Sequence, residues 1–293
     1  MSVLLEREEY IEQAYFFRVY RERLNENAPA QDILASVHEE LLSTTKLPMA
    51  IEFLRGEIVL TGRVSEGMLR LSHYFTPFQA FIMGRAEEDR SRFDQKIALE
   101  VLQREAEYRA GTLTPAGLFV FQFECLSRNR LGYDRGMEAM ADDPLYDEAW
   151  RGWIRKTRFR LGAVEFNELI YYSSEQWLLD RRRQLQDPEY QPTHPILFGF
   201  KEGRIAGANR GKDPLYMFAA LQRHLGYPQI PQPKPPQGAE RLIPQLQAQI
   251  VNLEKRLQLL EGELKGNLDL SEFVVKPVAV PDEPGGEGIG DRG

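Results

Sequence analysis

The sequence predicts a mainly α-helical, multi-helix globular body, followed by a Pro-rich linker and a C-terminal coiled-coil helix. Three observations indicate this organisation. Apolar residues recur at helical spacing through most of residues 1–226, five prolines crowd residues 227–238, and a heptad pattern occupies residues 239–266. The acidic end, residues 267–293, has too few apolar residues to form a core, so we expect a disordered tail. Within the body we expect at most one small β-hairpin.

The composition of the chain limits the classes of protein to which it can belong. The chain has 293 residues, of which 42% are hydrophobic and 28% are charged, as in ordinary soluble globular proteins. The net charge of −7 argues against bulk binding of nucleic acid. Cys125 is the single cysteine, so no intrachain disulfide forms, which fits a reducing compartment. Because we find neither a signal-peptide pattern nor an apolar run of about 20 residues, we expect a cytoplasmic protein without a membrane partner.

Apolar spacing and helix-breaking residues divide the first half of the body into helices. The strongest amphipathic pattern comes last and ends at a glycine. The expected segments are a helix through Tyr10 and Leu24 that breaks at 27–29, a helix over about 31–44, a helix from Pro48 through Ile58, and a helix over 90–109 that Gly111 ends.

Capping signals define helices in the second half. Thr114 precedes Pro115 and opens an aromatic-rich helix that we expect at the centre of the core. An Asp-Pro-x-Tyr sequence occurs at 143–146, 187–190 and 213–216. Asp is a good N-cap and Pro suits the first helical position, so the first and third are predicted helix starts. The second leads into further prolines and is predicted to be a turn.

Two segments allow more than one interpretation. Residues 164–174 are rich in aromatic and β-branched side chains, which permits a strand, but the flanking residues favour a long helix that continues through Trp177 and Leu178. Residues 196–209 fit a small hairpin with a glycine turn, and an irregular loop is the alternative.

Metal sites need ligands at defined spacings, and the sequence shows none. A single cysteine excludes a four-cysteine zinc site, and no histidine follows a glutamate by three positions, as in helical di-iron sites. We therefore predict no metal ligands and no cofactor. The histidines lie far apart, at His38, His73, His194 and His224.

No catalytic motif stands out either. Cys125 lies among aromatic residues and is predicted to be a small buried hydrophobe rather than a nucleophile. Glu165 and Glu168 would share one face of a helix and could divide acid and base roles, but glutamate-rich helical surfaces usually only face solvent. The glycines and cations of 207–212 could hold an anion, but Asp213 would repel it, so a surface turn is favoured.

A basic segment, Trp150 to Arg160, is the best polar patch. Interleaved aromatic and basic side chains can grip single-stranded nucleic acid. In a helix, however, its tryptophans share a face that would anchor it, and several arginines share a neighbouring face that can pair with acids of the body. The acidic body favours this second interpretation, so nucleic-acid binding is not expected to be the main role. The basic residues are Arg151, Arg155, Lys156, Arg158 and Arg160.

The heptad segment is the most specific signal. Isoleucine at position a with leucine at position d favours a parallel dimer. The alternative is a lone amphipathic helix that folds back on its own chain. Position a holds Ile243, Ile250, Leu257 and Leu264, and position d holds Leu246, Leu253 and Leu260.

We therefore expect a non-catalytic helical adaptor or scaffold that self-associates, or binds a helical protein partner, through its coiled coil. One alternative is an enzyme or small-ligand binder whose site is assembled within the helical body. Another is a weak nucleic-acid binder that uses the basic segment.

Overall fold

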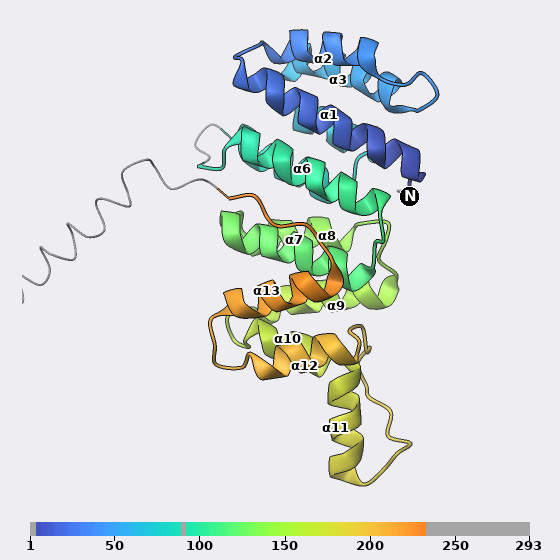
Figure 1. Cartoon of the computed structure of the whole chain (residues 1–293), viewed down its shortest axis with the longest axis vertical. Coiled ribbons are helices and arrows are strands. Elements are labelled where there is room, and N and C mark those ends of the chain that lie inside the picture. The colour runs from blue at the N-terminus through green and yellow to red at the C-terminus, as the bar shows by residue number, and fades with distance from the viewer. Residues whose placement is uncertain (1–3, 89–91, 233–293) are drawn as a thin grey trace, which may run out of the picture. The chain divides into compact units, whose positions relative to one another are not determined.

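The structure of the protein, a computed structural model, describes residues 4–88 and 92–232 (Figure 1). The described residues form helices and two isolated bridges, with no strand among them, so the mainly helical prediction is confirmed for this part. None of the described helices is long and apolar enough to span a membrane. The helices are α1 (Arg7–Asn25), α2 (Ala30–Glu40), α3 (Leu47–Thr61), α4 (Val64–Arg70), α5 (Pro77–Glu87), α6 (Gln95–Ala110), α7 (Pro115–Asn129), α8 (Tyr133–Ala141), α9 (Glu148–Arg160), α10 (Phe166–Tyr172), α11 (Glu175–Leu185), α12 (Phe200–Ala208) and α13 (Pro214–Leu225).

The helices of the body lie in successive layers (Figure 1). Helices α2 and α3, in blue, form the layer at one end, and α11, in yellow, lies at the other. Helix α1 packs along α6 more extensively than any other described pair, although four helices separate them in the sequence. One continuous core runs through these layers, from Phe16 in α1 to Ile230 beyond α13.

Helix α7 lies at the centre of this core, as predicted. Thr114 caps it, because its hydroxyl oxygen accepts a hydrogen bond from the Gly117 amide at 3.1 Å. Leu118, Phe119 and Phe121 are completely buried. Aromatic residues therefore fill the helix surface on several sides, as expected for an element that is covered all round.

Two of the predicted helix boundaries need correction. Helix α2 ends at Glu40, before the expected end near residue 44, because the chain turns away so that the Leu42 amide donates to Glu12 Oε2 at 3.2 Å. Helix α6 begins at Gln95 rather than near residue 90, because the Asp94 carboxylate accepts from the Lys96 amide at 2.7 Å and caps the helix there.

The predicted hairpin at 196–209 is wrong, because most of this segment forms α12. Gly203, taken for a turn glycine, sits inside the helix. A Cβ atom at Gly203 would come within 2.2 Å of Ser174 Oγ, so the glycine permits close packing of α12 on the start of α11. Because Ser174 lies far from Gly203 in the sequence, the local pattern could not distinguish a glycine needed for close packing from a turn glycine.

Residues 164–174 are helical, as the flanking residues predicted, but the expected long helix divides into α10 and α11. Ser174 causes the division, because its hydroxyl oxygen accepts from the Trp177 amide at 3.3 Å and caps α11. The Ser173 carbonyl accepts hydrogen bonds from the amides of Leu197 and Phe198, at 2.8 and 3.0 Å. The chain therefore leaves the body after residue 174 and rejoins it at residue 197.

All three Asp-Pro-x-Tyr sequences form the same local turn. In each, the Asp carboxylate accepts from the amide two residues on, and the Tyr amide donates to the Asp carbonyl. Only the turn at Asp213 continues into a helix, α13, as predicted. The prediction of a helix start at Asp143 is wrong, because α9 begins at Glu148 with Asp147 as its N-cap.

The described body extends past the predicted boundary at residue 226. Tyr227 and Ile230 are buried, and the Tyr227 hydroxyl donates to Glu124 Oε2 at 2.7 Å. Asn129 Nδ2 donates to the Pro231 carbonyl at 3.2 Å. The first six residues of the expected linker thus belong to the body. The rest of the linker, the heptad segment and the tail lie outside the described residues.

Candidate functional site

The basic segment predicted from the sequence forms α9. Trp150, Trp153 and Ile154 anchor it, since they are only 6%, 7% and 0% exposed. The Trp153 indole Nε1 donates to Ser173 Oγ at 2.7 Å and so ties α9 to the end of α10. This is the anchoring face expected from the helical spacing of these three residues.

Three of the five basic side chains pair with acids. Arg155 lies 3.2 Å from Glu138 and 2.6 Å from Asp142, on and just beyond α8. Arg158 pairs with Glu138 and with Asp134, and Arg151 pairs with Glu148 on its own helix. These cations are therefore largely neutralised, as the pairing interpretation predicts.

Lys156 and Arg160 lie on a different face of α9, over a cavity of about 540 Å³. Both are exposed, and neither side chain has a hydrogen-bond or ion-pair partner among the described residues. Residues 172–173, at the end of α10, and residues 193–195, just before the chain rejoins the body, form the remaining walls. The structure thus divides the predicted patch into a paired side and an unpaired side, and the unpaired side borders a pocket. We call this cavity the α9 pocket.

The α9 pocket favours negative charge. His194 lies in its wall, and its Nε2 donates to the Tyr172 carbonyl at 2.6 Å, which leaves Nδ1 without a partner among the described residues. Glu148 is the one acidic residue in the wall, and its carboxylate is held by Arg151 at 3.2 Å. Two unpaired cations therefore face the pocket against one acid that is already paired.

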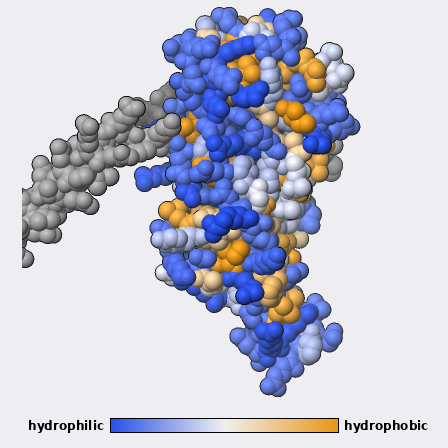
Figure 2. All heavy atoms as spheres, viewed as in Figure 1, coloured by the Kyte–Doolittle hydropathy of each residue, from blue (hydrophilic) through white to orange (hydrophobic). Residues whose placement is uncertain are grey.

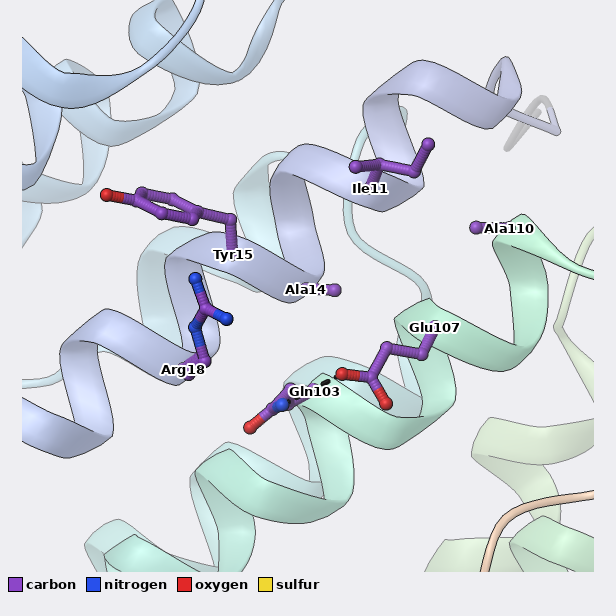
Figure 3. A pocket seen from close by; sticks show the side chains of 7 residues that line it. All are labelled: Ile11, Ala14, Tyr15, Arg18, Gln103, Glu107 and Ala110. Atoms are coloured by element: carbon purple, nitrogen blue, oxygen red, sulfur yellow. Dashed lines mark hydrogen bonds between the residues drawn. The ribbon is translucent and has the colours of Figure 1, made fainter.

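A second hollow lies between α1 and α6 (Figure 3). It has a volume of about 370 Å³ and is bordered by Ala14, Arg18 and Gln103 among others. Gln103 Nε2 donates to Glu107 Oε1 at 2.8 Å across its floor. The Arg18 guanidinium lies over the Tyr15 ring at 5.2 Å from its centroid. The polar side chains of this hollow thus have partners, in contrast to Lys156 and Arg160 of the α9 pocket, which have none among the described residues.

Helix α3 carries an exposed apolar stripe, which we call the α3 outer face: Met49, Phe53, Gly56 and Leu60. The exposed fractions of Met49, Phe53 and Leu60 are 71%, 39% and 78%. The spacings of four, three and four residues place all four on one side of the helix. Figure 2 shows that apolar residues elsewhere reach the visible surface as separate patches among hydrophilic ones.

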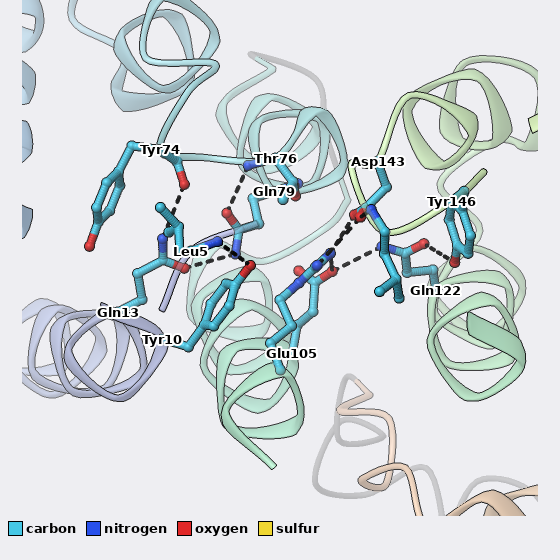
Figure 4. Close-up of polar contacts among 12 residues, drawn as sticks. Leu5, Tyr10, Gln13, Tyr74, Thr76, Gln79, Glu105, Gln122, Asp143 and Tyr146 are labelled. Atoms are coloured by element: carbon cyan, nitrogen blue, oxygen red, sulfur yellow. Dashed lines mark hydrogen bonds and ion pairs between the residues drawn. The ribbon is translucent and has the colours of Figure 1, made fainter. Parts of the chain in front are cut away.

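Buried polar residues form two hydrogen-bonded networks inside the core, a first that joins α1 to α5 and a second that joins α6 to α7 (Figure 4). Gln79 Nε2 donates to Gln13 Oε1 at 3.1 Å, and Gln13 Nε2 donates to the Tyr74 carbonyl at 3.3 Å. Gln122 Nε2 donates to Glu105 Oε1 at 2.9 Å, and Tyr146 Oη donates to Gln122 Oε1 at 3.2 Å. Each contact joins separate segments, so each network fixes how the segments that it joins sit on each other.

Arg109 is the charged centre of the second network. It pairs with Glu105, at 2.9 Å, and with Asp143, and the side chains of all three residues are fully buried. Burial raises the pKa of the Glu105 carboxyl above its usual 4.5, and the charge of Arg109 opposes this effect. The sequence pattern did not reveal this cluster, because its only local signal is the spacing of four residues between Glu105 and Arg109.

The other candidates from the sequence occupy structural positions. Cys125 is completely buried, and burial raises the pKa of its thiol, so it is held as the neutral thiol of a core residue. Glu165 and Glu168 contact the 209–211 turn separately, through the Gly211 amide at 3.4 Å and Arg210 at 3.9 Å. No group of residues that could hold a metal ion occurs within the described ranges.

Comparison with models of protein families, with curated proteins and with solved structures finds no significant match to this chain. The functional interpretation of the α9 pocket therefore depends on its geometry alone.

Proposed function

We propose that the protein is a helical adaptor or scaffold that self-associates through the heptad segment, residues 239–266. The observation that carries this proposal is the unbroken heptad pattern, with isoleucine or leucine at a and leucine at d. Seven apolar side chains on one stripe would be exposed to water in a lone helix, and pairing two such stripes buries them. The parallel dimer is the arrangement that this residue pattern favours.

The fixed end of the body supports the same proposal. Because Tyr227, Ile230 and Pro231 pack against α7 and α13, the chain leaves the body at a defined point beside Asn129. Only residues 233–238 separate that point from the heptad segment, and three of them are proline. Proline-rich segments are stiff, so a dimeric coiled coil would hold two bodies at a restricted separation.

Sedimentation equilibrium of the full chain tests the proposal. We expect twice the monomer mass at tens of micromolar protein for the natural sequence, and the monomer mass for Leu253→Lys, which places a charge in the seam. Asn252→Lys adds the same charge one residue away and outside the seam, so its mass should remain that of the dimer.

Leu60→Lys separates this proposal from its strongest rival, which is association through the α3 outer face. This variant should sediment like the natural chain. If Leu60→Lys gives a monomer while Leu253→Lys stays dimeric, the bodies associate through α3 and the coiled-coil proposal is wrong. A monomer for the natural sequence up to 100 µM would also contradict it.

A further inference from the structure

Gly152 lies in the middle of α9 without a packing reason. Glycine destabilises a helix interior relative to alanine. A Cβ atom at Gly152 would meet no atom within 4 Å, and its φ angle is not positive. Close neighbours require two other helical glycines, since a Cβ would come within 2.6 Å of Leu126 at Gly136 and within 2.1 Å of Tyr108 at Gly117, whereas Gly56 in α3 has open space like Gly152. The space beside Gly152 is the α9 pocket, whose wall it forms.

We infer that the α9 pocket binds a small organic phosphate. The phosphate group would lie between Lys156 and Arg160, and the organic part would lie against Gly152 and Trp153, where the missing side chain leaves room. This assignment is independent of self-association through the heptad segment.

The charges of the pocket carry the first part of the argument. Lys156 and Arg160 are four residues apart on one helix face, so their like charges repel each other in the unliganded protein. The acid of the wall, Glu148, is exposed, and its carboxylate lies 3.2 Å from the Arg151 guanidinium on the same helix. A phosphate between the two cations replaces this repulsion with charge-assisted hydrogen bonds.

Further donors make a phosphate the better fit than a single carboxylate. Ser173 Oγ accepts from the Trp153 indole, so the serine hydroxyl hydrogen remains to be donated. Thr193 brings a second hydroxyl to the same wall. Two cations and two hydroxyls match a group with three terminal oxygens, whereas a carboxylate has two.

The size and limits of the positive surface favour a small ligand over a nucleic-acid strand. A volume of about 540 Å³ lies within the range of roughly 300–1,000 Å³ that is usual for small-molecule pockets. The neighbouring cations Arg155 and Arg158 face α8 and are paired with acids there. The unpaired positive charge of α9 therefore ends at the pocket, whereas a strand needs a groove that follows its backbone.

Isothermal titration calorimetry on the full chain tests the inference, with phenyl phosphate and adenosine monophosphate as probes. Quenching of tryptophan fluorescence provides a second readout, because Trp153 lines the pocket. We expect one-to-one binding of both probes, tighter than that of inorganic phosphate, benzoate or adenosine. Binding should weaken by about tenfold or more in Lys156→Gln and in Arg160→Gln, since each removes a charge-assisted contact.

Two further variants distinguish the pocket from general attraction of anions. Gly152→Leu fills the space and leaves both positive charges in place, and it should abolish binding without lowering the melting temperature. Arg155→Gln removes a cation of the same helix that points toward α8, and its affinity should change less than twofold. Circular dichroism would confirm that all variants remain helical.

Several outcomes would overturn the inference. One is that neither probe gives binding heat or quenches the fluorescence at 10 mM. Another is that Gly152→Leu binds the probes as tightly as the natural chain does. If benzoate binds as tightly as phenyl phosphate, the pocket does not select phosphate over carboxylate. If a 15-nucleotide DNA strand binds more tightly than adenosine monophosphate and Lys156→Gln weakens it, the surface is a nucleic-acid interface instead.

Discussion

Arg109 and Asp143 form an ion pair in the interior of the body, although they lie 34 residues apart in the sequence and neither side chain reaches solvent. The pair joins the last turn of α6 to the turn that precedes α9. Glu105 completes the cluster, so one guanidinium serves two buried carboxylates. A buried charge without a partner is far more costly than an exposed one, so the fold is sensitive to the loss of any member of this cluster.

Replacing Arg109 should destabilise the protein strongly. Arg109→Met leaves Glu105 and Asp143 buried without their cation, so we expect the free energy of unfolding to fall by about 3–5 kcal/mol. Urea denaturation followed by circular dichroism measures this change. Arg155→Met is the matched control, because Arg155 pairs with two acids at the exposed surface, where such pairs contribute about 0–1 kcal/mol. Equal losses in the two variants would contradict the assignment.

Glu105→Gln should change how stability depends on pH. The folded pKa of Glu105 lies above its usual 4.5, so the folded state holds this proton more tightly than the unfolded state does. The resulting stabilisation is complete below pH 4.5 and is lost as the pH rises through the folded pKa. Glutamine keeps the shape of the protonated acid but does not titrate.

The natural chain should therefore lose stability relative to Glu105→Gln as the pH rises above about 4.5. Urea midpoints of both proteins, measured between pH 4 and pH 8, give this difference directly. A difference that stays constant across the range, or that grows in favour of the natural chain, would show that Glu105 is not held with a raised pKa.

Two helical glycines should respond oppositely to alanine. Gly203→Ala places a Cβ atom within 2.2 Å of Ser174 Oγ, so we expect a loss of about 1–3 kcal/mol from overpacking between α12 and α11. Gly152→Ala meets no neighbour and should gain about 0.5–1 kcal/mol from better helix propensity. Thermal unfolding of both variants provides the test, and stabilisation by Gly203→Ala would contradict the close packing.

Local sequence signals identified those helices that are begun by a capping residue within their own segment. Thr114 and Asp213 were predicted to start helices, and each does so through a side-chain cap within its own segment. The turn at Asp143 shows the limit of this reasoning. It has the same sequence signature and the same hydrogen bonds as the turn at Asp213, but Asp143 is held in the core by Arg109. No local pattern could reveal that partner.

For the candidate site, the sequence predicted only a group of basic residues and not the pocket beside them. The spacing of α9 correctly placed its aromatic residues on the anchoring face. Which basic residues would be neutralised depends on the acids of α8, whose position is set by packing between helices. The wall at His194 comes from a segment more than thirty residues away in the sequence, so the pocket itself had no sequence signal.

The double hydrogen bond at the Ser173 carbonyl closes residues 175–196 into a side branch of the fold. Helix α11 has no buried residue, so it contributes no side chain to the buried core. This branch nevertheless supplies Thr193, His194 and Pro195 to the α9 pocket, while Gly152, Trp153 and Lys156 of its lining belong to α9. The buried core and the branch of residues 175–196 are thus separate parts of the fold. Grafting a different sequence between residues 186 and 195 is therefore a route to altered ligand selectivity in an unchanged body.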